Sequence, residues 1–195
     1  MKAGVLCAAL SSIPLVAAAA PESYTFDPHH TFIHFGVDHN DFSTIWGRFD
    51  KSSGKFTIDR QAKTGAVEIS VETASLSTGD GVRGDRPRSR DEHLRSVDFF
   101  NAAEFPRMVY KASAVKFSGE VPVEVSGQLT LLGVTRPVVL TVDRWRCAAH
   151  PVTKRGICGG NAVGSLLRSD FGMKWGIPAT GDEVKIRVTF EALKD

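Results

Sequence analysis

Histidine is the side chain best suited to bind a metal or to transfer protons near neutral pH, and four of the six histidines lie close together. They are His29, His30, His34 and His39. In a β-strand, residues of like parity share a face, so His39 lies with Phe35 and the even-numbered histidines lie opposite. A metal or haem site would need further ligands from other strands. We expect structural roles for these histidines, and leave His39 open between a structural role and a polar anchor on the apolar face.

A run of arginines forms a second candidate site, because guanidinium groups suit phosphate oxygens. The run contains Arg83, Arg86, Arg88 and Arg90. Nearby carboxylates balance part of this charge, and such runs are most often solvated loops. The alternative is that Arg83, Arg86 and Arg88 contact the head group of a phosphorylated ligand.

Two of the three cysteines, Cys147 and Cys158, bracket a short loop that contains Pro151 and Gly156. In an oxidising compartment this spacing favours a disulfide. The alternative is a two-thiolate metal site, for which His150 is the nearest further ligand in the sequence. We predict the disulfide.

Familiar catalytic signatures are missing from the sequence. It contains no Gly-x-Ser-x-Gly elbow, no phosphate-binding loop and no zinc-binding helix motif. A nucleophile and its base would have to come together from distant strands. We therefore do not expect an enzyme, and expect no catalytic residue and no metal site. A metal- or haem-binding protein, and less favourably an enzyme, remain the alternatives.

The first twenty residues have the character of a secretory signal peptide. Lys2 precedes an apolar run over residues 5–16, and residues 17–20 are small. Residues 21–195 then form one domain, which we expect in the periplasm or outside the cell. Without Lys2 the basic residues number 23 against 22 acidic ones, a net charge of +1. This balance argues against a nucleic-acid partner.

Apolar and polar residues alternate in residues 67–71, 123–131 and 184–190. Successive side chains of a strand point to opposite faces, so each segment has one apolar and one polar face. Similar segments separated by short turns bring the total to about eight antiparallel strands. Ser89 and Glu92 form a capping box, which predicts one short helix in the long connection that follows residue 78.

These elements predict an all-β fold, an extended antiparallel barrel of about eight strands, with a two-sheet sandwich as the competing architecture. One apolar face must be enclosed in either case. Alternation alone leaves open whether this face packs into a closed core or lines a cavity. The residues assigned to the enclosed face are Ile33, Phe35, Val37, His39, Val67, Ile69, Val71, Val125, Leu129, Leu131, Leu140, Val142, Ile186 and Val188.

Four ordered motifs resemble the signature of one family, the YceI-like family of lipocalin-like, polyisoprenoid-binding proteins. The resemblance covers nearly all of residues 21–195, although the stretch formed by residues 79–89 is longer than the one the family pattern usually shows. The motifs are Tyr24-Thr25-Phe26-Asp27-Pro28 with Phe35-Gly36-Val37-Asp38-His39, Arg90-Asp91-Glu92-His93-Leu94-Arg95 continuing to Glu104-Phe105-Pro106, Gly127-Gln128-Leu129-Thr130-Leu131-Leu132-Gly133, and Arg168-Ser169-Asp170-Phe171-Gly172-Met173.

The resemblance implies an exported barrel whose hydrophobic lumen holds a long isoprenoid chain, such as a polyprenyl phosphate or the tail of a quinone. It favours a cavity over a closed core, and carriage of the lipid without chemistry on it. The lipid is then a bound ligand rather than a cofactor. A transient membrane contact and a dimer are both compatible with such a carrier.

Overall fold

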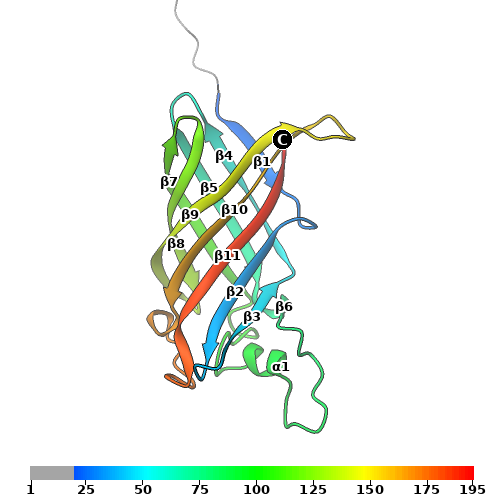
Figure 1. Cartoon of the computed structure of the whole chain (residues 1–195), viewed down its shortest axis with the longest axis vertical. Helices are drawn as coiled ribbons and strands as arrows, with labels where there is room; N and C mark the ends of the chain where they lie inside the picture. The colour runs from blue at the N-terminus through cyan, green and yellow to red at the C-terminus, as the bar shows by residue number, and fades with distance from the viewer. Residues whose placement is uncertain (1–19) are drawn as a thin grey trace, which may run out of the picture.

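The computed structural model describes residues 20–195, so the predicted signal peptide lies outside the described residues except for Ala20. Within this range the chain forms eleven β-strands, one α-helix and two short 3-10 helices (Figure 1). The helix α1 spans Arg90–Arg95, and the 3-10 helices span Thr73–Ser75 and Arg168–Phe171. The strands are β1 (Glu22–Phe26), β2 (Phe32–His39), β3 (Ser43–Phe49), β4 (Ser52–Asp59), β5 (Thr64–Glu72), β6 (Leu76–Ser77), β7 (Arg107–Ser118), β8 (Val121–Leu131), β9 (Val134–Ala149), β10 (Gly156–Leu167) and β11 (Thr180–Lys194).

Eight of these strands close into an antiparallel barrel in the order β1-β4-β5-β7-β8-β9-β10-β11. The pairing of β1 with β11, which brings Phe26 opposite Ala192, completes the ring. Strands β2, β3 and β6 continue the sheet beside the first half of β11. The predicted all-β barrel is confirmed, and the sandwich is excluded.

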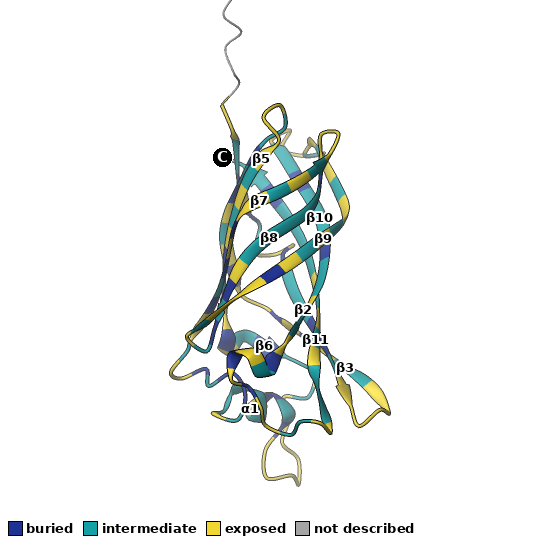
Figure 2. Ribbon diagram, turned by 90° about the vertical axis from the view of Figure 1, so that its left-hand side faces the viewer, coloured by how far each residue is buried: buried dark blue, intermediate teal, exposed yellow. Residues whose placement is uncertain are grey.

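The two ends of the barrel differ (Figures 1 and 2). At one end lie the turns at residues 60–63, 119–120 and 150–155, together with the C-terminus. We call it the disulfide end. At the other end lie the turns at residues 40–42 and 132–133, the connection 168–179 and α1. We call it the helix end.

The capping box starts α1 as predicted. The Glu92 N–H donates to the Ser89 hydroxyl at 3.1 Å, and the Ser89 N–H donates to the Glu92 carboxylate at 2.6 Å. Such a cap stabilises a helix by about 1 kcal/mol. The helix ends at Arg95, after which Phe100 packs on Phe49 with ring centroids 5.3 Å apart. The buried Phe100 therefore anchors the helical segment to the barrel.

Irregularities in three strands of the barrel, β7, β8 and β9, change which residues face inward. In β9 the pairing with β10 skips Asp143, so that Arg144 pairs with Asn161 and Val142 with Ala162. Such an extra residue reverses the alternation. Val142 faces the interior before this point, and Trp145 faces it afterwards. In β8 a similar shift places Pro122 on the interior in place of Val123, the residue that simple alternation predicts.

Candidate functional site

The barrel encloses a cavity of about 450 Å³. All fourteen residues that the sequence assigns to the enclosed face line this cavity. Its volume lies within the range of about 300–1,000 Å³ that is usual for ligand pockets. The interior is therefore hollow, and the alternative of a closed core is excluded. Binding of a ligand by these fourteen residues stays a prediction.

Aromatic side chains close the cavity towards the disulfide end. Phe56 on β4 and Trp145 on β9 stand on opposite sides of the ring, yet their ring centroids are 5.7 Å apart. Phe190 on β11 contacts both, at 6.1 Å from Phe56 and 5.9 Å from Trp145. We call these three residues the aromatic plug. Sequence reasoning missed the plug because its members meet across the barrel.

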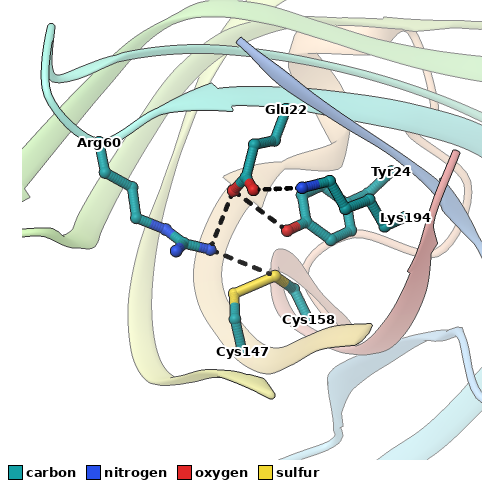
Figure 3. Close-up of a disulfide and its surroundings, with 6 residues drawn as sticks. All are labelled: Glu22, Tyr24, Arg60, Cys147, Cys158 and Lys194. Atoms are coloured by element: carbon teal, nitrogen blue, oxygen red, sulfur yellow. Dashed lines mark hydrogen bonds and ion pairs between the residues drawn. A yellow bond between two sulfur atoms is a disulfide. The ribbon is translucent and has the colours of Figure 1, made fainter. Parts of the chain in front are cut away.

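Beyond the plug, a disulfide and a group of charged residues cover the same end (Figure 3). Cys147 and Cys158 are directly paired across β9 and β10 and form the predicted disulfide. The Arg60 guanidinium lies 3.8 Å from the Cys158 sulfur and 3.3 Å from the Glu22 carboxylate. Glu22 also accepts a hydrogen bond from Lys194, which, with burial opposing, holds the pKa of Glu22 below its usual value.

Removing this disulfide with Cys147→Ala and Cys158→Ala together is expected to lower the free energy of unfolding by about 2–4 kcal/mol, because the unfolded chain loses a closed loop. Urea unfolding of the oxidised protein and of the double variant measures the difference. Reduced wild type serves as the control, and should unfold near the variant. Coincident curves for the oxidised protein and the variant would contradict the prediction.

The cavity opens at the helix end. Four of the residues that line it are exposed, and three of these, Asp38, His39 and Trp175, lie there. Arg90 and His93 of α1 also line the cavity. The opening is therefore bounded by α1, the end of β2 and the segment that precedes β11, and it combines charged and aromatic groups. We call it the mouth.

His93 connects α1 to its surroundings at the mouth. Its Nε2 lies 2.9 Å from the Asp98 carboxylate and 2.6 Å from the Arg88 guanidinium. The ring also packs edge-on against Trp175, with centroids 4.5 Å apart. These contacts join α1 to the segment that precedes β11, and Phe99, whose ring centroid lies 5.3 Å from that of Trp175, joins the same two sides of the mouth.

The Arg168 side chain holds the segment that precedes β11 in place through hydrogen bonds to its backbone. The side chain is buried, with 2% of its surface exposed. It donates hydrogen bonds to the carbonyl oxygens of Gly181 at 2.8 Å, Met173 at 3.1 Å and Thr180 at 2.8 Å. Burial lowers the pKa of Arg168, and the nearby Asp182 carboxylate opposes this shift. Arg168 lines the cavity and also shapes the mouth.

The arginines predicted to contact a head group lie outside the cavity lining. Arg86 forms two hydrogen bonds with Asp80, at 2.7 and 2.6 Å, and thereby lowers the pKa of Asp80 to about 2. Arg83 donates to the carbonyl oxygen of Arg86 at 2.7 Å, and Arg88 pairs with Asp98 at 3.1 Å. Head-group contact by Arg83, Arg86 and Arg88 stays a prediction.

The structure disperses the clustered histidines. His30 pairs with Asp27 at 2.7 Å, and this hydrogen bond raises the pKa of His30. His34 lies beside Arg187 and Arg48 of the neighbouring strands, and burial, followed by these cations, lowers its pKa. His39 lies at the mouth. Across residues 20–195, no three His, Cys, Asp or Glu side chains gather in a group that could hold a metal ion.

The residues at the mouth were also beyond the reach of sequence reasoning about a ligand site. For Arg90, His93 and Arg168 the sequence favours caps and ion pairs over acid–base chemistry, and their spacing does not indicate a shared site. A tryptophan at an open loop position, Trp175, was the available signal.

Among the described residues, no helix is long and apolar enough to cross a membrane.

Comparison with known proteins gives consistent matches. A family model described as a YceI-like domain matches residues 24–192. Protein YceI of Escherichia coli O157:H7 is 29% identical over 179 residues, which cover 91% of this chain and 89% of that protein. The UPF0312 protein of Photorhabdus laumondii is 31% identical over 180 residues, which cover 92% and 89%.

Solved structures share the fold. Burkholderia cenocepacia BcnA superimposes with a TM-score of 0.66 at 22% identity, covering 85% of this chain and 98% of that one. A polyisoprenoid binding domain from Saccharophagus degradans, implicated in plant cell wall breakdown, gives a TM-score of 0.64 at 18% identity, covering 88% and 98%.

Proposed function

Because the chain belongs to the YceI-like family, we propose that it binds a long isoprenoid lipid, a polyprenyl phosphate or a quinone, in its barrel and carries it outside the cytoplasm. The observation that carries this proposal is a cavity with apolar walls that is closed by aromatic rings at one end and bordered by polar groups at the other. The polyisoprenoid-binding domain with the same fold supports the ligand class.

The shape of the cavity favours one orientation of the lipid. Each methylene group that leaves water for the apolar wall contributes about 0.8 kcal/mol, without the need for directed contacts. The tail therefore extends towards the aromatic plug, and the head group stays at the mouth beside Arg90 and His93. The walls offer apolar contact, which suits a carrier that does no chemistry on its ligand.

Export is the second part of the proposal. The sequence of residues 1–20 supports it, and so does the disulfide between Cys147 and Cys158, since such bonds persist in oxidising compartments. The periplasm or the cell exterior is therefore the proposed location. The oligomeric state is not part of the proposal.

Organic extraction tests ligand binding directly. The full chain is purified from a bacterial host and extracted, and the extract is analysed by mass spectrometry. We expect a polyprenyl lipid to co-purify, and delipidated protein to take up added polyprenyl phosphate or quinone. Repeated preparations without lipid, together with no uptake of either probe, would overturn the proposal.

Two sets of variants locate the head group in the same assay. Arg90→Ala at the mouth is expected to weaken binding of a polyprenyl phosphate severalfold more than binding of the matching uncharged prenol. The triple variant Arg83→Ala, Arg86→Ala and Arg88→Ala tests the loop arginines in the same way. Equal losses for the two lipids in either variant would exclude head-group contact by the residues replaced.

A further inference from the structure

Four exposed apolar side chains lie on the loops and turns at the helix end of the barrel. Phe42 is 88% exposed, Val82 79%, Val97 78% and Trp175 47%. We call these four residues the mouth rim. Exposed apolar side chains gathered at one end of a protein mark a contact site.

The mouth rim surrounds the opening of the cavity. Phe42 follows the lining residue His39, to whose carbonyl oxygen its N–H donates at 3.1 Å. Val97 follows α1, and Trp175 itself lines the cavity. Val82 lies in the loop that precedes α1, and Figures 1 and 2 place all these segments at the same end. Anything that covers the rim therefore also covers the mouth.

The rim and the cavity together indicate which surface covers this end. The four side chains come from separate loops, an arrangement suited to insertion between acyl chains. A lipid tail that leaves an uncovered mouth would cross water at a cost of about 0.8 kcal/mol for each methylene group. A bilayer against the mouth removes that barrier.

Charge contributes little to such a contact. Residues 79–97 contain five arginines and four carboxylates. Arg86 is paired with Asp80, and Arg88 with Asp98. The helix end therefore has no strong excess of positive charge in this loop, and its attraction to a membrane is expected to depend on apolar insertion rather than on anionic lipids.

We propose that the protein docks on a lipid bilayer through the mouth rim, with the mouth facing the membrane. This inference rests on the proposed function, because lipid exchange is what makes the orientation useful. Docking itself does not require a bound ligand, so it is measured separately.

Vesicle sedimentation tests the proposal with the delipidated full chain. The vesicles are pure phosphatidylcholine in one arm and an equimolar mixture with phosphatidylglycerol in the other. The rim variant combines Phe42→Ser, Val82→Ser and Val97→Ser. The matched control combines Val121→Ser and Val152→Ser, which are 44% and 80% exposed at the disulfide end. All these side chains are exposed, so thermal unfolding should change little.

We expect the wild type and the control to bind both kinds of vesicle with similar affinity, and the rim variant to bind at least about tenfold more weakly. Added salt should have little effect. Equal binding by the rim variant and the control would overturn the proposal, as would a wild type that binds neither vesicle. Self-association that light scattering detects in the wild type, and not in the rim variant, would assign the rim to a second copy instead.

The lipid-uptake assay separates this inference from the proposed function. A protein that takes up polyprenyl phosphate but binds no vesicles refutes docking alone. A protein that binds vesicles through the rim but takes up no lipid refutes the carrier function alone.

Discussion

Replacing Ala162 with tryptophan is expected to weaken binding of long isoprenoid chains at least a hundredfold, while short chains still bind. Ala162 on β10 lines the cavity, and it is paired with Val142 on the neighbouring strand β9 and with Val188 on the neighbouring strand β11. It lies between Cys158 at the disulfide end and Arg168 at the mouth, so an indole there divides the cavity. A hundredfold loss is about 2.7 kcal/mol, which corresponds to roughly three or four methylene groups displaced into water.

The measurement is a binding series with prenols of increasing chain length. Wild-type affinity should rise with length until the chain reaches the aromatic plug. The Ala162→Trp variant should follow the same rise for short chains and then stop. Val139→Trp, on β9 where the side chain is 49% exposed, is the matched control and should leave the series unchanged. Parallel curves for the two variants would mean that the lipid does not occupy the barrel.

The cavity wall could be predicted from the sequence because its signal is local. In β5 and β11, alternate residues such as Ile69 and Ile186 face inward for the whole strand, and period two suffices to identify them. The start of α1 was predictable for the same reason, since Ser89 and Glu92 satisfy each other's backbone N–H groups within one turn. A disulfide between paired strands also needs only a short connecting loop.

The ends of the cavity could not be predicted in this way, because they depend on contacts between distant residues. The bulge at Asp143 reverses the alternation in β9 and turns Trp145 inward, where it meets Phe56 from the other side of the ring. Neither residue indicates the other in the sequence. At the mouth, His93 meets Trp175, 82 positions further along the chain, through the closure of the barrel.

The sequence also did not predict which of the arginines in residues 83–90 lines the cavity. Their number and spacing suggest a phosphate site, but the geometry decides which of them faces the cavity. Arg86 forms two hydrogen bonds with Asp80, whereas Arg90, four residues later on α1, lies 3.7 Å from the same carboxylate and lines the cavity. The run of like charges lies at the helix end of the barrel (Figure 1), and the helix that follows it places Arg90 in the cavity lining.

Arg168→Met is expected to lower the free energy of unfolding by roughly 3–5 kcal/mol, even though methionine is an unbranched side chain that tolerates burial. The variant leaves the carbonyl oxygens of Met173, Thr180 and Gly181 without their donor. Each unsatisfied acceptor costs about 1–3 kcal/mol, with the lower part of this range expected for the two hydrogen bonds that are only partly buried. Arg168→Lys keeps the charge but loses the planar fork, so we expect an intermediate loss.

Urea unfolding measures these differences, with the exposed Arg136→Met as the control that should change stability by less than about 0.5 kcal/mol. The same variants also test how the mouth is built. Arg168 holds the segment that carries Trp175, and Trp175 packs on His93 of α1. Loss of Arg168 should therefore speed the release of a bound prenol even under conditions in which the barrel stays folded. Unchanged release from the folded Arg168→Met variant would mean that this segment does not control the opening, whatever its contribution to stability.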